Sequence, residues 1–236
     1  MINQSITILL PVYNEEQNVR KMVKELDNIL VNLFQSYEVL VVESGSTDNT
    51  AKVLDDLKNE YSCLNVINEG AKNGLGSGIR TGIKKTESDI IVYMDSDIPF
   101  DLNVLNKVFP MDDEVDVLVG YRTGTRETFA RWFFSKGYNI LIKSLFGIKV
   151  RDVNYSFKVL RKKVYKDLNL ISNGWFIDAE ILARVTKRKC QISQVGIPYK
   201  HRESGESVVR INHKLIFGML KEMWDYYKDE KNNCKC

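Results

Sequence analysis

Two aspartates, Asp95 and Asp97, stand one position apart at the end of the apolar run 90–94. The run is typical of a buried strand, because it consists of β-branched, aromatic and other apolar residues. Carboxylates at the mouth of such a strand are costly unless they are paired or share a cation. The pair therefore predicts a divalent metal site at the carboxyl end of this strand. The alternative is an acidic turn in which Asp97 caps a helix that begins near Asp101.

The elements that must position this pair follow from hydrophobic spacing. Strands are expected at 5–10, 37–42, 64–67, 90–94, 115–120, 155–160 and 190–195, and helices after Asn14 to about 33, then to about 60 and 85, and at 101–109, 128–147, 178–187 and 214–228. Pro11 is expected to stop the first strand and Asn14 to cap the first helix. Strands that alternate with helices predict an α/β protein with a doubly wound, mostly parallel sheet, whose ligands bind at the carboxyl ends of the strands.

Composition excludes several classes of protein. A net charge of +3 over 236 residues is too mild to imply nucleic-acid binding. No window supplies about 18 uncharged apolar residues, so no transmembrane helix is expected. The 4 cysteines lack metal-site spacing and fit a reducing compartment. We expect a single domain over 1–236.

Two segments leave their role open. The glycine-rich segment 70–78 matches neither a Walker loop nor the full dinucleotide fingerprint, so it is expected to allow a tight turn and close helix packing, or to lend backbone N–H groups to a ligand. The expected helix 128–147 mixes aromatic and aliphatic residues with Arg131, Lys136 and Lys143. This mixture fits either a core helix or a helix at a membrane surface.

Three motifs of the first half, taken together, carry a resemblance to a known family. They are Asp95-Ser96-Asp97, Leu10-Pro11-Val12-Tyr13-Asn14-Glu15-Glu16 and Val41-Val42-Glu43-Ser44-Gly45-Ser46-Thr47-Asp48-Asn49-Thr50. They resemble the inverting glycosyltransferases of family two, which have the GT-A fold. The second half resembles the dolichyl-phosphate mannose and glucose synthase branch, through Gly120-Tyr121-Arg122, Arg131, Ser135, Asp152, Ser156-Phe157, Gly174, Glu180, Arg202 and Gly205-Glu206-Ser207.

The resemblance implies a nucleotide-sugar half over 1–120. Its donor, of the GDP-mannose or UDP-glucose type, would bind Pro11, Tyr13, Glu15, Val42, Ser44, Asp95, Ser96, Asp97 and Arg202. Tyr13 would stack on the base and Arg202 would clamp the diphosphate. Asp97, supported by Asp95, would hold Mg²⁺ or Mn²⁺, because these ions prefer oxygen ligands.

The resemblance also implies an acceptor-side half over 121–236, with interfacial helices. Arg122, Arg131 and Ser135 would bind a polyprenyl phosphate, and Arg131 and Ser135 share a face because they are four residues apart on the expected helix. Catalysis would rest on Asp95, Asp97 and Arg122, by metal-assisted in-line displacement with inversion, and an ionised phosphate needs no strong general base. The implied location is the cytoplasmic face of a membrane, reached through these helices or through a separate membrane-protein partner.

Glu43-Ser44 departs from the family pattern, which has two aspartates there, and so leaves the choice of base open. The mannose or glucose choice also stays open. A second enzyme reading is a soluble transferase that acts on a sugar hydroxyl, with Asp178 or Glu180 as the base. The non-enzyme reading is a degenerate nucleotide-sugar-binding module.

Overall fold

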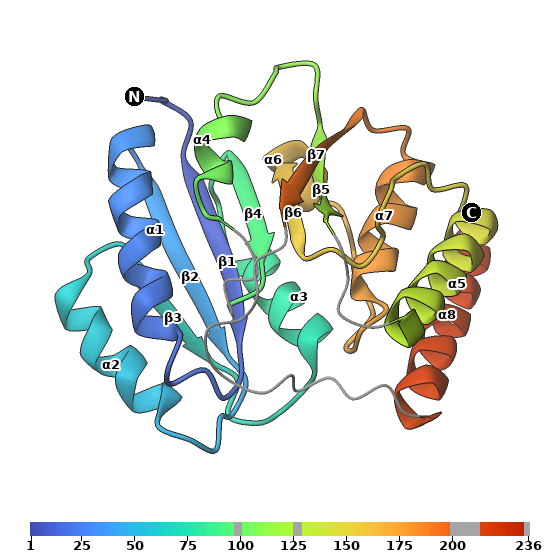
Figure 1. The fold of residues 1–236 in the computed structure, drawn as a ribbon, viewed down its shortest axis with the longest axis horizontal. Coiled ribbons are helices and arrows are strands. Elements are labelled where there is room, and N and C mark those ends of the chain that lie inside the picture. Colours follow the sequence, from blue (N-terminus) through green and yellow to red (C-terminus); the bar gives the residue numbers. More distant parts are fainter. Residues whose placement is uncertain (97–100, 125–128, 199–212, 234–236) are drawn as a thin grey trace.

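The computed structural model describes residues 1–96, 101–124, 129–198 and 213–233, with the backbone alone at 129–134, 213–215 and 232–233. Within these residues the strands form one sheet (Figure 1) in the order β3-β2-β1-β4-β6-β5-β7. The strands are β1 (Ile6–Val12), β2 (Tyr37–Glu43), β3 (Leu64–Asn68), β4 (Ile90–Met94), β5 (Val117–Thr123), β6 (Phe157–Arg161) and β7 (Ile192–Pro198). Only β6 runs antiparallel to its two neighbours among these pairs. The predicted α/β class with a mostly parallel sheet is confirmed.

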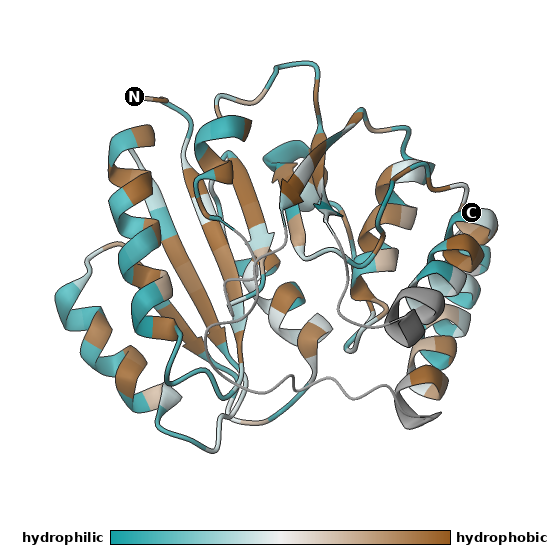
Figure 2. Cartoon of the chain, in the orientation of Figure 1, coloured by the Kyte–Doolittle hydropathy of each residue, from teal (hydrophilic) through white to brown (hydrophobic). Residues whose placement is uncertain are grey.

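Helices cover both faces of the sheet. They are α1 (Val19–Leu33), α2 (Thr50–Glu60), α3 (Leu75–Lys85), α4 (Val104–Val108), α5 (Phe129–Phe146), α6 (Lys162–Tyr165), α7 (Ile177–Lys187) and α8 (His213–Asn233). One buried core packs α1, α2 and α4 on one face, and a second packs α3, α5, α6, α7 and α8 on the other. Alternating side chains of β1 and β4 enter the two cores, so β4 is apolar along its whole length and β1 is apolar except at the buried Thr7 (Figure 2).

A glycine sets the distance between α3 and the sheet. A Cβ on Gly82 would lie 2.1 Å from Cδ1 of Leu9, which is too close for any real side chain. The helix can therefore lie close against β1 only because position 82 has no side chain.

Two local predictions were wrong. Pro11 lies inside β1, opposite Val42, and it is tolerated because the pairing of β1 with β4 ends at Leu9. Asn14 does not cap a helix, since α1 begins at Val19 and Asn14 has a φ of 57°. Its side-chain oxygen instead accepts a hydrogen bond from the backbone N–H of Thr47 at 2.8 Å. Asn14 thus joins the loops that follow β1 and β2.

The helix α5 serves the core on one side and is exposed on the other. Ile142 is buried, and the ring of Phe146 lies 5.4 Å from that of Tyr226 on α8. In contrast, Ile140 and Leu145 are more than half exposed. One face of α5 therefore belongs to the core, whereas membrane contact of the exposed face stays a prediction. No helix among the described residues combines the length and apolarity needed to cross a bilayer.

Candidate active site

The predicted donor residues of β1 and β2 lie together at the carboxyl edge of the sheet. Pro11 pairs with Val42, and the Ser44 N–H donates to the carbonyl of Val12 at 3.0 Å. Gly78 of α3 faces this group, because a Cβ there would lie 3.4 Å from Pro11, 3.6 Å from Ser44 and 3.7 Å from Val42. Three segments that are distant in sequence thus form one wall of a candidate nucleoside site.

Tyr13 already has a cation over its ring. The Lys72 ammonium lies 3.8 Å from the ring centroid, within the range of a cation–π interaction. Stacking of a base on this face would require Lys72 to move, whereas the opposite face is not affected by this contact. Lys72 belongs to the glycine-rich segment and brings positive charge to the donor side.

Glu15 and Glu43 organise the loops around this wall. The backbone N–H of Glu15 donates to Oγ1 of Thr50 at 2.8 Å, and its carboxylate accepts from Asn18 at 2.7 Å. The buried Glu43 carboxylate accepts from the backbone N–H of Ser46 at 2.5 Å. Glu43 is therefore used to shape the loop between β2 and α2.

Asp95, Arg122 and Tyr155 lie at the carboxyl edge of the sheet, after β4, near the end of β5 and before β6. Asp95 follows β4 directly and is half-buried, while the neighbouring Ser96 is buried. The guanidinium of Arg122, on β5, lies 5.9 Å from the Tyr155 ring centroid. Burial raises the pKa of Tyr155, the charge of Arg122 lowers it, and the carboxylates of Asp95 and Asp152 raise it further. Two side chains of opposite charge, 27 positions apart in the sequence, thus influence the pKa of one tyrosine.

A buried ion pair lies beneath this group. Lys158 of β6 pairs with Asp178 of α7, and both side chains are almost completely removed from solvent. Lys158 also donates to the carbonyl of Tyr155 at 2.8 Å. Burial raises the pKa of the Asp178 carboxyl, and the Lys158 charge opposes that shift. The pair fixes the backbone that carries Tyr155.

Neither carboxylate considered as a general base faces a substrate. Asp178 is held by Lys158, as described above. Glu180 is fully buried and accepts from the backbone N–H groups of Ile171 and Ser172 at 2.9 and 2.8 Å, and from Arg184 at 2.8 Å. These contacts assign both carboxylates to the structure of α7 and argue against a base role.

Part of the predicted site lies outside the described residues, namely Asp97, Arg202 and the side chain of Arg131. The backbone of Arg131 lies in α5 one turn before the half-buried Ser135, as the four-residue spacing requires. Across the described part of the chain, no cluster of three or more His, Cys, Asp or Glu side chains could hold a metal. Asp95 is the one carboxylate of the predicted pair that the structure describes, and carboxylate oxygens are the donors that a hard divalent cation prefers.

Several contacts at this edge have no counterpart in the sequence motifs. Tyr155, Lys158 and Lys72 were not predicted as site residues. Lys158 had one usable signal, since a lysine inside an apolar strand needs a buried partner. Tyr155 and Lys72 had none, because their roles depend on which loops the fold brings together.

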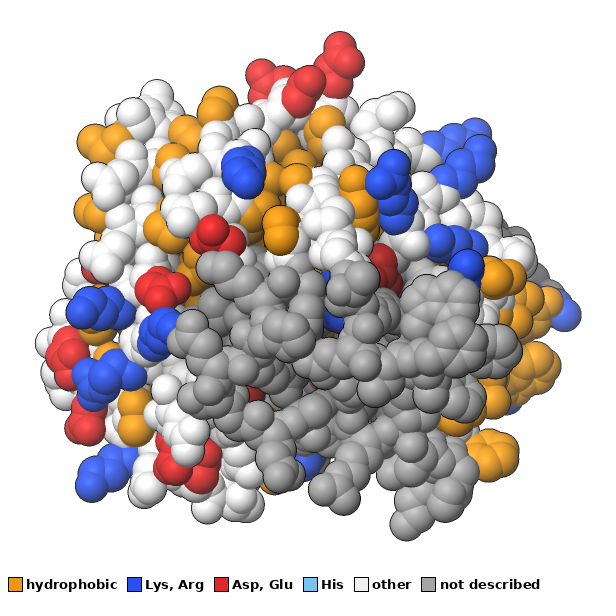
Figure 3. Space-filling model, in the orientation of Figure 1, with side chains coloured by type: hydrophobic (Ala, Val, Ile, Leu, Met, Phe, Trp, Pro, Cys, Tyr) orange, Lys and Arg blue, Asp and Glu red, His pale blue; other side chains and the backbone are white. Residues whose placement is uncertain are grey.

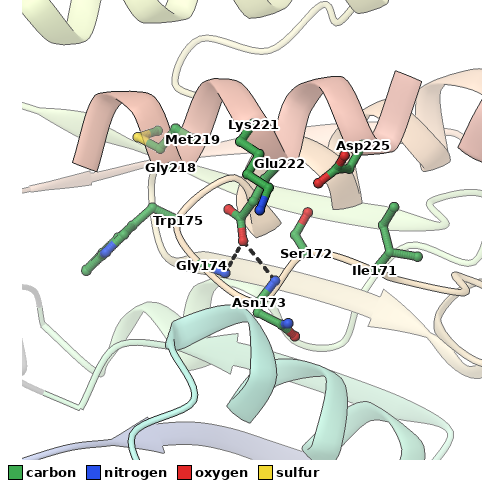
Figure 4. A pocket seen from close by; sticks show the side chains of 10 residues that line it. All are labelled: Ile171, Ser172, Asn173, Gly174, Trp175, Gly218, Met219, Lys221, Glu222 and Asp225. Carbon is green, nitrogen blue, oxygen red and sulfur yellow. Dashed lines mark hydrogen bonds between the residues drawn. The ribbon is translucent and has the colours of Figure 1, made fainter. Parts of the chain in front are cut away.

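A separate cavity of about 420 Å³ lies between α8 and the loop before α7 (Figure 4). Glu222 of α8 points at this loop and accepts from the backbone N–H groups of Asn173 and Gly174 at 3.0 and 2.5 Å. Among the donor and acceptor residues whose side chains the structure describes, none lines this cavity. Glu222 thus anchors α8 to the body of the protein.

Comparison with known proteins agrees with this architecture. Residues 7–168 match the model of the family described as glycosyl transferase family 2. A dolichol-phosphate mannosyltransferase of Pyrococcus furiosus is 28% identical over 95% of this chain and 64% of its own length. A dolichyl-phosphate β-glucosyltransferase of Trichomonas vaginalis is 27% identical over 92% of this chain and 72% of its own length.

A solved structure shares the fold. It is the glucosyl-3-phosphoglycerate synthase of Mycobacterium tuberculosis, in complex with Mn²⁺, UDP-glucose and phosphoglyceric acid. The TM-score is 0.70 with 17% identity, over 93% of this chain and 79% of the other. Fold and site edge together define a GT-A type protein. The chain belongs to glycosyl transferase family 2, as the match over most of its length shows. It spans just under two thirds of the length of the Pyrococcus relative.

Proposed function

We propose that this protein transfers a hexose, mannose or glucose, from a nucleotide sugar to a polyprenyl phosphate at a membrane surface. Two relatives whose names specify dolichyl-phosphate transfer support the acceptor class. The observation that carries the proposal is that Asp95, directly after β4, and Arg122, beside the Tyr155 ring on β5, lie at the same carboxyl edge of the sheet. A carboxylate for the donor side and a guanidinium for a phosphate are thus held within one small region.

The donor would lie along the wall formed by Pro11, Val42 and Ser44, with its diphosphate toward Asp95. Asp95 and Asp97 would hold Mg²⁺ or Mn²⁺, which would stabilise the negative charge that develops on the leaving diphosphate. Arg202 would contact the same diphosphate. On the acceptor side, Arg122 would bind the ionised phosphate and orient its oxygen for in-line attack, together with Arg131 and Ser135. Attack from the face opposite the leaving group inverts the anomeric centre.

A screen of donors and acceptors tests the proposal. Purified protein would be incubated with GDP-mannose or UDP-glucose, with a polyprenyl phosphate or a soluble sugar as the acceptor, and with Mg²⁺ or Mn²⁺. We expect transfer to the lipid phosphate alone, and we expect EDTA to abolish it and added metal to restore it. Transfer only to the sugar hydroxyl would support the soluble transferase. Nucleotide binding without turnover would support the degenerate binding module.

We also propose that the exposed apolar side chains of α5 and α8 contact the membrane surface, at the cytoplasmic face. They gather at the edge of the molecule that these two helices occupy (Figure 3), and they are Ile140, Leu141, Leu145, Ile216, Phe217, Leu220, Trp224 and Tyr227. The Trp224 and Tyr227 rings stack at 5.8 Å, and the Lys228 ammonium lies 5.5 Å from the Trp224 ring. Aromatic rings beside a lysine suit the boundary between acyl chains and lipid phosphates.

The double substitution Phe217→Ala and Trp224→Ala tests this contact. We expect the double variant to bind anionic liposomes about tenfold more weakly than wild type in a co-sedimentation assay at low salt, because two large apolar side chains no longer insert. The matched control is Val31→Ala, which truncates an exposed apolar side chain on α1. Equal binding by the double variant and the control would contradict the proposal, as would wild-type protein that stays in the supernatant.

A further inference from the structure

Glu69 has three hydroxyl donors on one carboxylate. One oxygen accepts from Ser77 at 2.9 Å and from Thr81 at 2.8 Å, both on α3. The other accepts from the hydroxyl of Ser44 at 3.1 Å. The backbone N–H of Glu69 donates to the carbonyl of Glu43 at 2.9 Å, so the residue is fixed to the end of β2. No lysine or arginine of the described residues forms an ion pair with it.

These contacts determine what Ser44 can offer to a ligand. A serine hydroxyl has one proton to donate and two lone pairs that accept. The proton is directed at Glu69, so the lone pairs remain for a further partner, and donation to a carboxylate strengthens them as acceptors. Position 44 thus behaves as an acceptor, as an aspartate would, although it carries no charge itself. The negative charge is that of Glu69, which follows the last residue of β3.

We infer that Glu69 is a positioning residue that acts through Ser44 and makes the nucleoside site select ligands with an N–H or O–H donor at this point. The inference rests on the proposed function, because it takes Ser44 to line the donor site beside Pro11 and Val42. Ser44 is 7% exposed, so a ligand group that reaches it would leave water and would need a matching partner.

The hydrogen-bonding groups of the bases determine which nucleosides such an acceptor would select. Uracil and guanine carry a ring N–H on the Watson–Crick edge, whereas cytosine and adenine carry a ring acceptor there. An acceptor at position 44 would therefore favour uridine and guanosine diphosphates over the cytidine and adenosine forms, because a site built for one hydrogen bond rejects a ligand that leaves it unpaired. A ribose hydroxyl is the other source of the same donor.

Binding of UDP, GDP, CDP and ADP in the presence of Mn²⁺, measured by calorimetry, tests the inference without any acceptor. We expect Glu69→Gln to weaken the preferred diphosphate about tenfold and to reduce its preference over CDP and ADP, since the amide can turn its N–H₂ toward Ser44. Ser44→Ala should have the same effect. The matched control is Glu38→Gln, because Glu38 also accepts two side-chain hydrogen bonds but stands at the other end of β2.

A rescue separates positioning from a merely structural role. Adding Ser44→Asp to Glu69→Gln should restore both affinity and preference, whereas Ser44→Asp alone places two carboxylates together and should weaken binding. The 2′-deoxy diphosphates identify the source of the donor. If the donor is a ribose hydroxyl, they bind wild type more weakly than the ribose forms do, and Glu69→Gln and Ser44→Ala lower the affinity for all four diphosphates without a change of preference. If the donor is a ring N–H, the 2′-deoxy forms bind wild type as well as the ribose forms, and both variants also lower the preference over CDP and ADP. Loss of affinity in both variants supports the inference in either case.

Wild-type protein that binds no nucleoside diphosphate would overturn the proposed function itself. Wild-type binding together with unchanged affinity and preference in Glu69→Gln and Ser44→Ala would overturn only the inference. If Glu69→Gln fails to fold, as judged by circular dichroism, the result for Ser44→Ala decides, because this variant keeps the carboxylate and both of its contacts to α3.

Discussion

Replacement of Arg122 by alanine is expected to lower transfer to polyprenyl phosphate by about 10²- to 10³-fold, because the reaction loses a fixed positive charge beside the acceptor phosphate. Arg122 is half-buried on β5 and its guanidinium lies next to Tyr155, so no neighbouring side chain of that strand can take its place. The measurement is the initial rate with saturating nucleotide sugar and varied lipid phosphate. Arg122→Lys should recover only part of the rate, since an ammonium lacks the planar fork that binds two phosphate oxygens.

The matched control for this prediction is Arg151→Ala. Arg151 is exposed, and its guanidinium lies 4.5 Å from the ring of Tyr121, so it also combines an arginine with a tyrosine face. We expect near wild-type transfer from this control. Arg122→Ala protein that is folded, binds the nucleotide and retains full transfer would remove Arg122 from the acceptor site.

Replacement of Asp178 by alanine is expected to destabilise the protein by about 3–5 kcal/mol, because it leaves the buried Lys158 ammonium without its counter-charge. For a chain of this size, that loss corresponds to a fall in melting temperature of roughly 10 °C. Equilibrium denaturation in urea measures the free energy of unfolding. Because Lys158 also holds the carbonyl of Tyr155, nucleotide-dependent activity should fall with stability.

Two further variants define the cause of this loss. Glu87→Ala removes a carboxylate whose pairs with Lys162 and Lys166 lie at the surface, where water and salt screen the charges, so its effect on stability should be far smaller than that of Asp178→Ala. The double replacement Lys158→Met with Asp178→Leu should recover most of the stability, because two apolar side chains of similar size leave no buried charge. If Asp178→Ala is as stable as Glu87→Ala, the Lys158–Asp178 ion pair does not stabilise the backbone that carries Tyr155.

Much of the fold follows from local patterns. The apolar runs of β1, β2 and β4 alternate with amphipathic helices, and this alternation alone predicts a parallel sheet with a ligand edge. The carboxyl ends of α2 and α3 and both ends of α7 also lie close to their expected positions, because their apolar spacing ends sharply. Spacing could not show that β6 inserts antiparallel between β4 and β5, since strand order depends on which apolar faces cover one another.

The incorrect predictions at Pro11 and Asn14 have the same physical cause. Proline was expected to end β1 because it lacks an N–H, but the missing donor matters only where a neighbouring strand needs it, and β4 does not pair with β1 at that position. Asn14 has the side chain of a good cap, yet its side-chain amide oxygen accepts a hydrogen bond from the backbone N–H of Thr47, which lies on another loop. A local preference gives way when a distant partner satisfies the same group.

The aspartates at 95 and 97 show what the sequence by itself determined: an acidic pair at the end of a buried strand, in a chain whose motifs are those of family-two glycosyltransferases. The tertiary structure decided which other charged groups share this edge with Asp95, since Arg122, Asp152 and Asp95 all influence the pKa of Tyr155. It also decided that the Ser44 hydroxyl donates a hydrogen bond to Glu69, which follows the carboxyl end of the neighbouring strand β3. The physical reason is that motifs record side chains near in sequence, whereas charge and hydrogen bonding at a site depend on distances between segments that only the folded chain brings together.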